Sequence, residues 1–252
     1  MDARTGRVAR VNAGAAHEAF AALPWGPAST IPGPVLILAP HPDDESLGTS
    51  GLIATLVAAG QSPFVMIMTD GAGSHPNSVA YPPARLRAVR EAEAASACAL
   101  LGLPQDRLDF MRLPDTGAPM AGPAFEVAVK QIAACARIIG TRSVLASWAH
   151  DPHCDHLATH RMAAAVCRTV TLAHWAYPVW GWTLPANHAL PPAAYAGFRL
   201  DITPYLPAKR AAIAAHRSQY AGLITDDPAG FVLPPRLLSI FDRPFETFIR
   251  LR

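Results

Sequence analysis

Short apolar runs and longer amphipathic segments alternate along most of the chain. The run "PVLILAP" (34–40) is continuous and contains β-branched residues, which is typical of a strand buried on both faces of a parallel sheet. "SGLIATLVAAG" (50–60) follows with helical spacing and a closing glycine, and "PFVMIMTDG" (63–71) is a second apolar run. This order of strand, helix and strand predicts a right-handed βαβ unit.

The same alternation continues downstream and sets the fold class. Alternating strands and helices favour a Rossmann-like, three-layer α/β/α fold with a mostly parallel sheet. The further elements that the pattern predicts are helices over 82–102, 123–140, 156–171 and about 207–221, and strands over 107–113, 142–148 and about 245–251.

Two segments do not follow this alternation. Residues 1–33 form an Ala-, Gly- and Pro-rich lead-in with a short helix near 17–23. We assign residues 34–252 to a single domain, because neither an internal repeat nor a linker divides them. The Pro- and Trp-rich stretch 175–192 predicts an irregular wall or lid rather than a buried strand.

Composition and charge exclude several classes of protein. Of the 252 residues, 51% are hydrophobic and 16% are charged, so the chain can bury a core and is not a disordered chain. Its formal net charge of +2, without a basic run, gives no electrostatic reason to expect nucleic acid as a partner. No stretch approaches the roughly 18 consecutive apolar residues of a membrane span, so no membrane span is expected.

The cysteines and the first residues indicate the cellular compartment. The four cysteines are far apart and form no CxxC pair, which favours reduced thiols over a disulfide framework. The N-terminal residues lack the unbroken apolar segment of a signal peptide. We therefore expect a cytoplasmic protein, and the sequence leaves open whether it forms an oligomer.

Polar residues gather where three of the predicted strands end: "HPDDE" (41–45), "TDG" (69–71) and "WAHDPHCDH" (148–156). Open α/β sheets place their sites at the carboxyl ends of the strands, so we expect these clusters to converge. His-x-x-Asp in the first cluster and a histidine pair in the last are a mixed N/O ligand set that Zn²⁺ accepts. A dication also offsets the repulsion between adjacent carboxylates. The sequence therefore predicts a metal site.

These motifs resemble those of a known family. "APHPDDE" (39–45), with "HCDH" (153–156) later in the chain, is similar to the (A/P)HPDDE and HPDH motifs of the LmbE-like, or PIG-L, family of zinc-dependent N-acetylglucosaminyl de-N-acetylases. The resemblance extends over roughly residues 35–250 and implies the LmbE-like fold. The shorter elements that carry it are "MTDG" (68–71), Arg90 with Glu93, "LPDTG" (113–117) and "HRSQ" (216–219).

The resemblance implies a role for five residues of the two main motifs. His41, Asp44 and His156 would bind the metal. Asp43 would act as the general base, and His153 would stabilise the oxyanion. We expect hydrolysis by a water molecule that Zn²⁺ activates, and Fe²⁺ or Co²⁺ would accept the same ligands.

Three neighbours of these residues have open roles. Cys154 stands where the family has proline, which only shapes the turn, so we expect the ligands to be unchanged; a thiolate ligand is the alternative. Asp155 would either orient a histidine or cap the helix that follows. His160 lies one helical turn after His156, and we expect it to lie on the helix face or to support the ligands.

Residues for substrate binding are less well defined. Arg90 would reach a sugar hydroxyl or a phosphate, or would face solvent on its helix. Asp115 and His216 are candidates through the resemblance alone. Glu45 would either cap the following helix, which we favour, or bond to the substrate. The aromatic residues that would form either a sugar-stacking wall or ordinary packing are Trp175, Tyr177, Trp180 and Trp182.

We therefore predict a metal-dependent hydrolase that removes an N-acetyl or other N-acyl group from an amino-sugar-containing substrate. The substrate would be a small N-acetylated glycoside, a lipid-linked sugar or a nucleotide sugar. One alternative is an amidase that cleaves a non-sugar or thiol-conjugate amide with the same site. Another is a non-catalytic metal-binding, Rossmann-like protein. A nucleotide-binding oxidoreductase or transferase is disfavoured, because "HPDDE" rather than GxGxxG follows the first strand.

Overall fold

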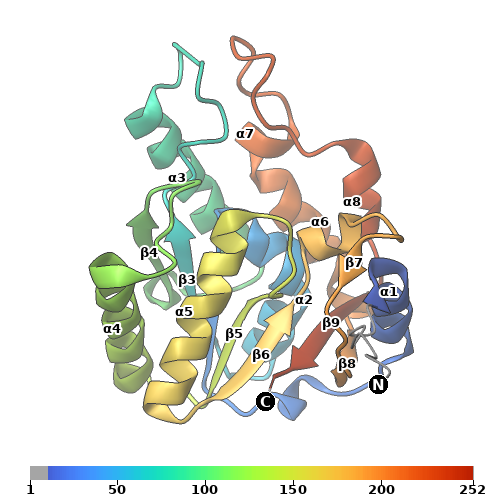
Figure 1. Ribbon diagram of the computed structural model, residues 1–252. Coiled ribbons are helices and arrows are strands. Elements are labelled where there is room, and N and C mark those ends of the chain that lie inside the picture. The colour runs from blue at the N-terminus through green and yellow to red at the C-terminus, as the bar shows by residue number, and fades with distance from the viewer. Residues whose placement is uncertain (1–10, 252) are drawn as a thin grey trace, which may run out of the picture.

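A seven-stranded sheet forms the centre of the computed structural model, which describes residues 11–251 (Figure 1). The first five strands across the sheet are mutually parallel, and β9 runs antiparallel to both of its neighbours. The predicted α/β class with a mostly parallel sheet is confirmed. In their order across the sheet, the strands are β4 (Leu108–Leu113), β3 (Phe64–Thr69), β2 (Val35–Ala39), β5 (Ser143–Ser147), β6 (Ala173–Tyr177), β9 (Phe245–Arg250) and β8 (Ala196–Asp201).

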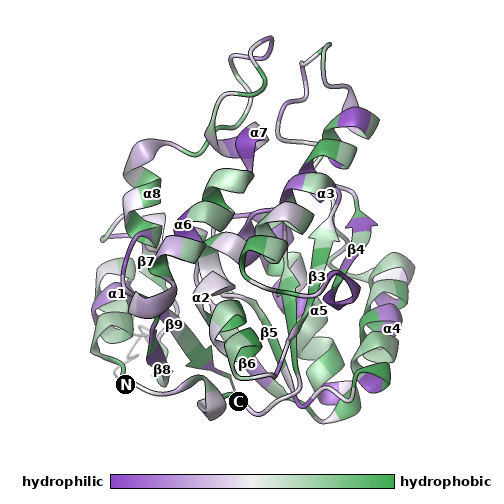
Figure 2. Ribbon diagram, turned by 180° about the vertical axis from the view of Figure 1, so that it is seen from behind, coloured by the Kyte–Doolittle hydropathy of each residue, from purple (hydrophilic) through white to green (hydrophobic). Residues whose placement is uncertain are grey.

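Helices cover both faces of this sheet because its central strands are apolar on both faces. Every residue of β2 is buried. Leu36 and Leu38 belong to the core beneath one helical layer, whereas Ile37 and Ala39 belong to the core beneath the other. Figure 2 shows β3 as hydrophobic along most of its length. The layers are α4 (Gly122–Ile138) with α5 (Cys154–Val170), and α2 (Asp44–Ala58) with α3 (Pro83–Leu100) and α6 (Leu206–Ala215).

The strand order reverses at β2. The chain runs outward from β2 through β3 to β4 and then returns to β5 on the other side of β2. In open α/β sheets, ligands bind beyond the carboxyl ends of the two strands that flank such a switch point. The "HPDDE" motif leaves β2 and the "HCDH" motif precedes α5, which follows β5. The topology therefore brings the two main motifs to one edge of the sheet.

The prediction for residues 175–192 is wrong at its beginning. Residues 173–177 form β6, which pairs with β5 in parallel, and the side chains of Trp175 and Tyr177 are buried. The Tyr177 hydroxyl donates a hydrogen bond to the Leu38 carbonyl (2.8 Å). A Cβ at Gly48 of α2 would overlap the Tyr177 ring, so this glycine allows the helix to lie directly on the strand. Trp175 and Tyr177 are therefore packed in the core, whereas Trp180 lines a cavity. The residues of this stretch after β6 contain only a short 3₁₀ turn and a two-residue strand.

The remaining elements lie around this framework. The helix predicted over about 207–221 is divided at His216 into α6 and α7, while β8 and α8 were not predicted. The part of the lead-in before Val11 lies outside the described residues. Among residues 11–251, no helix is long and apolar enough to cross a membrane. The elements not yet given are β1 (Val11–Asn12), α1 (Ala13–Ala22), η1 (Ala28–Thr30), η2 (Gln105–Arg107), η3 (Trp180–Thr183), β7 (Ala189–Leu190), η4 (Thr203–Tyr205), α7 (Arg217–Tyr220) and α8 (Pro235–Phe241).

A buried ion pair joins α2, α6 and β9. Glu246 accepts hydrogen bonds from the Lys209 ammonium group (2.8 Å) and from the backbone N–H groups of Gly51 (2.8 Å) and Leu52 (2.9 Å). Lys209 also donates to the Leu47 carbonyl (2.9 Å). Both charged side chains are nearly inaccessible to solvent. Each group of this network has a partner, so removal of one charge would leave the other buried and unpaired.

We expect Glu246→Ala to lower the free energy of unfolding by about 3–5 kcal/mol, the usual cost of breaking a buried pair from one side. Urea denaturation would measure it. Asp242→Ala, which breaks the exposed pair with Arg210, is the control and should cost less than about 1 kcal/mol. Equal losses for the two variants would contradict the importance of the buried pair.

Candidate metal centre and active site

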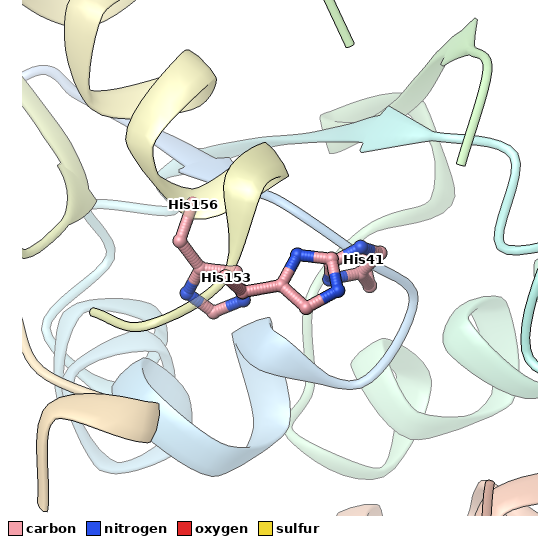
Figure 3. A group of neighbouring side chains, drawn as sticks. All are labelled: His41, His153 and His156. Carbon is pink, nitrogen blue, oxygen red and sulfur yellow. The ribbon is translucent and has the colours of Figure 1, made fainter. Parts of the chain in front are cut away.

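Residues from two strand ends converge at the switch point. His41 lies in the loop after β2, and His153 and His156 lie at the start of α5 (Figure 3). One ring nitrogen of each of these histidines lies within 4.8 Å of the others. The predicted convergence is therefore present for the first and last of the three clusters, which are more than 110 residues apart. The second cluster is connected to the first through Arg90, which donates to the Gly71 carbonyl and to Asp43.

Asp44, the first residue of α2, contacts two of these histidines. Its Oδ2 atom accepts a hydrogen bond from the His41 backbone N–H (2.9 Å) and lies 3.3 Å from His41 Nδ1. The same oxygen lies 3.2 Å from His156 Nε2. His41, Asp44 and His156 are all buried, with exposed fractions of 8%, 1% and 0%. Two imidazoles thus face one buried carboxylate oxygen.

The opposite ring nitrogens of the two histidines are held by other carboxylates. His41 Nε2 lies 3.0 Å from Asp155 Oδ2, and Asp155 also accepts the backbone N–H groups of Thr116 (2.7 Å) and Ala118 (3.0 Å). Asp155 therefore orients His41, which was one of its two predicted roles. His156 Nδ1 lies 2.9 Å from Asp151 Oδ2. Histidine ligands of metals are commonly oriented by such a carboxylate.

Asp151 was missed in the sequence analysis. It is buried, and besides His156 it binds the backbone N–H groups of Val179 (3.0 Å), Trp180 (3.2 Å) and Gly181 (2.7 Å). The sequence signal was an aspartate in the same turn as the histidine pair. Its partners in the turn after β6 follow only from the tertiary structure.

The donor set fits a divalent cation. His156 Nε2 is buried and makes no hydrogen bond among the described residues, although it faces Asp44. Burial lowers the pKa of His156, but Asp44 and Asp151 outweigh it and raise the pKa to about 9. Burial also lowers the pKa of His41, but the surrounding carboxylates outweigh burial and raise this pKa. Both rings therefore lie in a field that attracts positive charge, and neutral imidazoles with a carboxylate are a usual Zn²⁺ ligand set.

Asp43 lies beside this cluster with an unusual backbone. Its φ of 153° falls in the region that favours glycine, a conformation that costs about 1–3 kcal/mol. Its backbone N–H donates to Glu45 Oε2 (2.9 Å). His216 Nε2 lies 2.9 Å from the other oxygen of Glu45. The buried pair of Glu45 and His216 therefore holds the strained peptide, a role that differs from both predicted roles of Glu45, the helix cap and the contact with substrate.

The Asp43 carboxyl has a shifted pKa. Burial raises the pKa to about 6, the charge of Asp44 adds to this, and the charge of Arg90 opposes it. Arg90 Nη2 donates to Asp43 Oδ2 (3.2 Å) and to the Pro42 carbonyl (2.9 Å), and Nη1 donates to the Gly71 carbonyl (2.9 Å). Arg90 is therefore buried and bonded to the protein, and it does not lie on a solvent-exposed face of α3.

Asp115 comes from the loop after β4. It accepts the Gly73 backbone N–H (2.9 Å) and lies 3.4 Å from His41 Nε2. Burial raises the pKa of Asp115, but His41, Arg90 and Gly73 outweigh burial and lower this pKa to about 2. It therefore stays ionised and adds a third carboxylate to the surroundings of His41.

His153 begins α5 as its N-cap. Its Nδ1 accepts the Asp155 backbone N–H (3.2 Å), so the neutral ring carries its proton on Nε2. Burial, His41 and His156 lower the pKa of His153, which favours this neutral form. About a third of the side chain is exposed, so the ring can donate a hydrogen bond to a molecule in the adjacent cavity.

Cys154 and His160 lie outside this arrangement. Cys154 is exposed, and burial and Asp155 raise its pKa, which disfavours the thiolate that a metal would need. Its sulfur lies within 4.8 Å of ligand atoms of His153 and Asp155, but Asp155 is already bonded to His41 and two backbone N–H groups. His160 Nδ1 lies 3.0 Å from the carbonyl of Ser147, the last residue of β5, so its ring faces the sheet.

A cavity of about 520 Å³ opens next to the cluster. Its polar end is lined by His41, Asp43, Arg90, Asp115 and His153. This volume is within the range of small-molecule sites, about 300–1,000 Å³. The expected catalytic, substrate-binding and metal-binding residues thus surround one cavity, with Asp44 and His156 just behind its wall.

Comparison with known proteins identifies relatives of this chain. Residues 36–167, just over half of the chain, match the family described as "PIG-L: GlcNAc-PI de-N-acetylase". No match was found among curated proteins.

The solved structures with a similar fold include the three described next. N,N′-diacetylchitobiose deacetylase from Pyrococcus horikoshii, complexed with its inhibitor MPG, has a TM-score of 0.63 at 22% identity, covering 86% of this chain and 83% of that chain. The zinc-inhibited form of teicoplanin deacetylase Orf2 has a TM-score of 0.60 at 16% identity, covering 73% and 84%. GalB, the 4-carboxy-2-hydroxymuconate hydratase from Pseudomonas putida KT2440, has a TM-score of 0.52 at 21% identity, covering 72% and 77%. Because these proteins include both deacetylases and a hydratase, the fold alone does not select a reaction.

Proposed function

This chain belongs to the PIG-L family of GlcNAc-PI de-N-acetylases, and we propose that it is a metal-dependent hydrolase that removes an N-acetyl or other N-acyl group from an amino-sugar-containing small molecule. The observation that carries the proposal is the position of one buried carboxylate oxygen of Asp44, 3.2–3.3 Å from nitrogens of both His41 and His156. Asp43 lies beside it on a cavity large enough for a small-molecule substrate.

His41, Asp44 and His156 would hold the metal, with Zn²⁺ as the first candidate and Fe²⁺ or Co²⁺ as substitutes. The alternative set replaces Asp44 with His153. We favour Asp44 because its charge is buried and faces both other ligands, whereas His153 is partly exposed and bonded through Nδ1. A divalent cation held here would lower the pKa of a water molecule and polarise the acyl oxygen of the substrate.

Asp43 would be the general base. Its carboxyl lines the cavity, and a pKa raised to about 6 keeps it ionised at neutral pH while making it a better proton acceptor than an ordinary aspartate. Arg90 fixes one carboxyl oxygen, and the pair of Glu45 and His216 fixes the backbone. Asp43 would take a proton from the attacking water and later give it to the departing amine.

His153 would stabilise the negative charge that develops on the acyl oxygen. A neutral ring with its proton on Nε2 is a donor on the side of the ring opposite the bond from Asp155. A single well-placed donor of this kind contributes about 3 kcal/mol to catalysis. Asp115, held ionised near His41 and Arg90, lines the same cavity and would accept a hydrogen bond from a sugar hydroxyl.

The substrate class is proposed from the relatives. Two of the solved structures are deacetylases of N,N′-diacetylchitobiose and of teicoplanin. For this chain we propose a small N-acetylated glycoside, a lipid-linked sugar or a nucleotide sugar. Hydrolysis of an amide outside this class, such as a thiol conjugate, would use the same residues.

Acetate release tests the proposal. Purified protein would be loaded with Zn²⁺, Co²⁺ or Fe²⁺ and incubated with methyl N-acetylglucosaminide, N,N′-diacetylchitobiose and UDP-N-acetylglucosamine. We expect about one metal ion per chain and acetate release from at least one substrate, abolished by a chelator and restored by metal. Metal binding without release from any N-acylated sugar would overturn the sugar assignment and leave other amides. Absence of metal binding would overturn the hydrolase itself.

The role of His216 gives a further prediction. His216→Ala should lower kcat by about 10-fold or more, with unchanged metal content, because Glu45 Oε1 then keeps only the Ser46 hydroxyl (2.7 Å) and holds the Asp43 peptide less firmly. His216→Gln, which can still donate to Glu45, should retain more activity than the alanine variant. Separate measurement of kcat, KM and metal content checks this. Wild-type kcat in His216→Ala would show that the pair does not position the base.

A further inference from the structure

The cavity continues from its polar end into an apolar end formed by two loops. One loop, residues 70–82, joins β3 to α3, and the other, residues 221–234, joins α7 to α8. Both project beyond the carboxyl edge of the sheet and lie side by side (Figure 1). The side chains that present mostly carbon surface to the cavity are those of Pro76, Trp180, Phe231 and Val232.

The two loops are bonded to each other. Asp226 accepts hydrogen bonds from the Ser78 hydroxyl (2.7 Å) and the Ala80 backbone N–H (2.8 Å), and the Phe231 backbone N–H donates to the Ser74 carbonyl (2.7 Å). This wall of the cavity is therefore formed before any ligand binds. Preformed walls lower the entropic cost of binding.

Trp180 and Phe231 are in edge-to-face contact in the wall of the cavity. Their ring centroids are 5.6 Å apart and the rings are nearly perpendicular. The Trp180 backbone N–H is held by Asp151 Oδ2 (3.2 Å), the oxygen that also faces His156 Nδ1. The position of Trp180 is thus tied to that of the metal-binding cluster. Phe231 is 37% exposed, so a ligand could cover apolar surface that now faces water.

We propose that Trp180 and Phe231 form a subsite for an apolar aglycone of the substrate. This inference rests on the proposed function, because it assumes that the amino sugar binds at the polar end. At the polar end, Asp115 lines the cavity and would accept a hydrogen bond from a hydroxyl group of the amino sugar. Ser74 and Gln219 also line the cavity, but they are hydrogen-bonded to each other (3.2 Å). Apart from the Gln219 carbonyl oxygen, the apolar end therefore offers few free partners for the hydroxyl groups of a second sugar, which would lose their hydrogen bonds to water there. An aryl or alkyl group makes no hydrogen bonds to water, so it loses none on entering the apolar end, and it gains contact with two aromatic rings.

Binding of product glycosides tests the subsite. Phenyl and methyl β-glycosides of glucosamine carry no acetyl group, so they bind without being hydrolysed. Isothermal titration of metal-loaded wild-type protein with each would give the two dissociation constants. We expect the phenyl glycoside to bind at least about tenfold more tightly. Chitobiose, the corresponding glycoside of a second amino sugar, serves as the polar comparison and should bind more weakly than the phenyl glycoside.

Phe231→Ala should abolish the preference for the phenyl glycoside and leave affinity for the methyl glycoside unchanged. Phe231 is the better choice than Trp180, because it lies in an exposed loop and its removal should not disturb the core. Val79→Ala is the matched control, since Val79 is an apolar residue of the facing loop that is 89% exposed and does not line the cavity. Thermal unfolding of each variant checks that the fold is retained.

The outcomes separate the subsite from the hydrolase. Four results would each overturn the subsite. They are equal affinities for the phenyl and methyl glycosides, tighter binding of chitobiose, no binding of either glycoside, and an unchanged preference in Phe231→Ala. A preference that depends on Phe231, without acetate release from the corresponding N-acetyl glycosides, would support the subsite and count against the hydrolase.

Discussion

Replacing Asp43 with asparagine is expected to lower kcat by about 10²–10⁴-fold while the protein keeps its metal. Asparagine has the same shape and can still accept a hydrogen bond from Arg90, but it cannot take a proton at neutral pH. The proposed metal ligands lie on Asp44, His41 and His156, and the variant leaves all three in place. The loss should therefore fall on kcat and spare metal affinity.

Initial rates of acetate release and metal content per chain would be measured together for wild type and Asp43→Asn. Asp201→Asn, at an exposed residue whose contacts are with Thr203, is the matched control and should have wild-type kcat. Near-wild-type kcat in Asp43→Asn would assign the base elsewhere. Loss of metal in this variant would instead make Asp43 a ligand.

Removal of His156 is expected to lower metal affinity by at least about 100-fold and to abolish turnover with it. Loss of a residue that merely orients a ligand costs about 10–100-fold in metal affinity, so loss of the ligand itself should cost more. Because the pKa of His156 is raised to about 9, the metal must displace a proton from the ring. Metal affinity should therefore fall as the pH is lowered.

Matched histidine variants identify the ligand set. His160→Ala removes a histidine one helical turn further along α5 and should leave metal affinity unchanged, because His160 is bonded to the Ser147 carbonyl. His153→Ala should retain metal and lose activity if Asp44 is the third ligand. Loss of metal in His153→Ala, with retention in Asp44→Ala, would favour the three-histidine set. Dialysed protein analysed by mass spectrometry for bound metal gives these values directly.

Most of the central sheet could be predicted from the sequence because its strands are buried on both faces. β2, β3 and β5 are apolar runs without alternation, and a run of this kind with a helix on either side has few other interpretations. β6 was missed because its two aromatic residues are followed by Pro178, Trp180 and Trp182, a composition that is typical of a loop. Gly48 of α2 leaves the space in which the Tyr177 ring is buried, and a local sequence pattern carries no sign of that contact.

The amino-acid sequence shows which side chains follow the buried strands, and its resemblance to the PIG-L family predicts that His41, Asp44 and His156 bind a metal. What holds these residues in place is seen only in the folded protein. Asp151 supports His156 from the turn before α5, and it also binds the turn after β6. His216 supports the Asp43 peptide through Glu45 from a position 171 residues away. The type and spacing of residues can be seen in the local sequence. A contact between residues so far apart forms only when the helices pack on the sheet, because packing brings these buried charged side chains together.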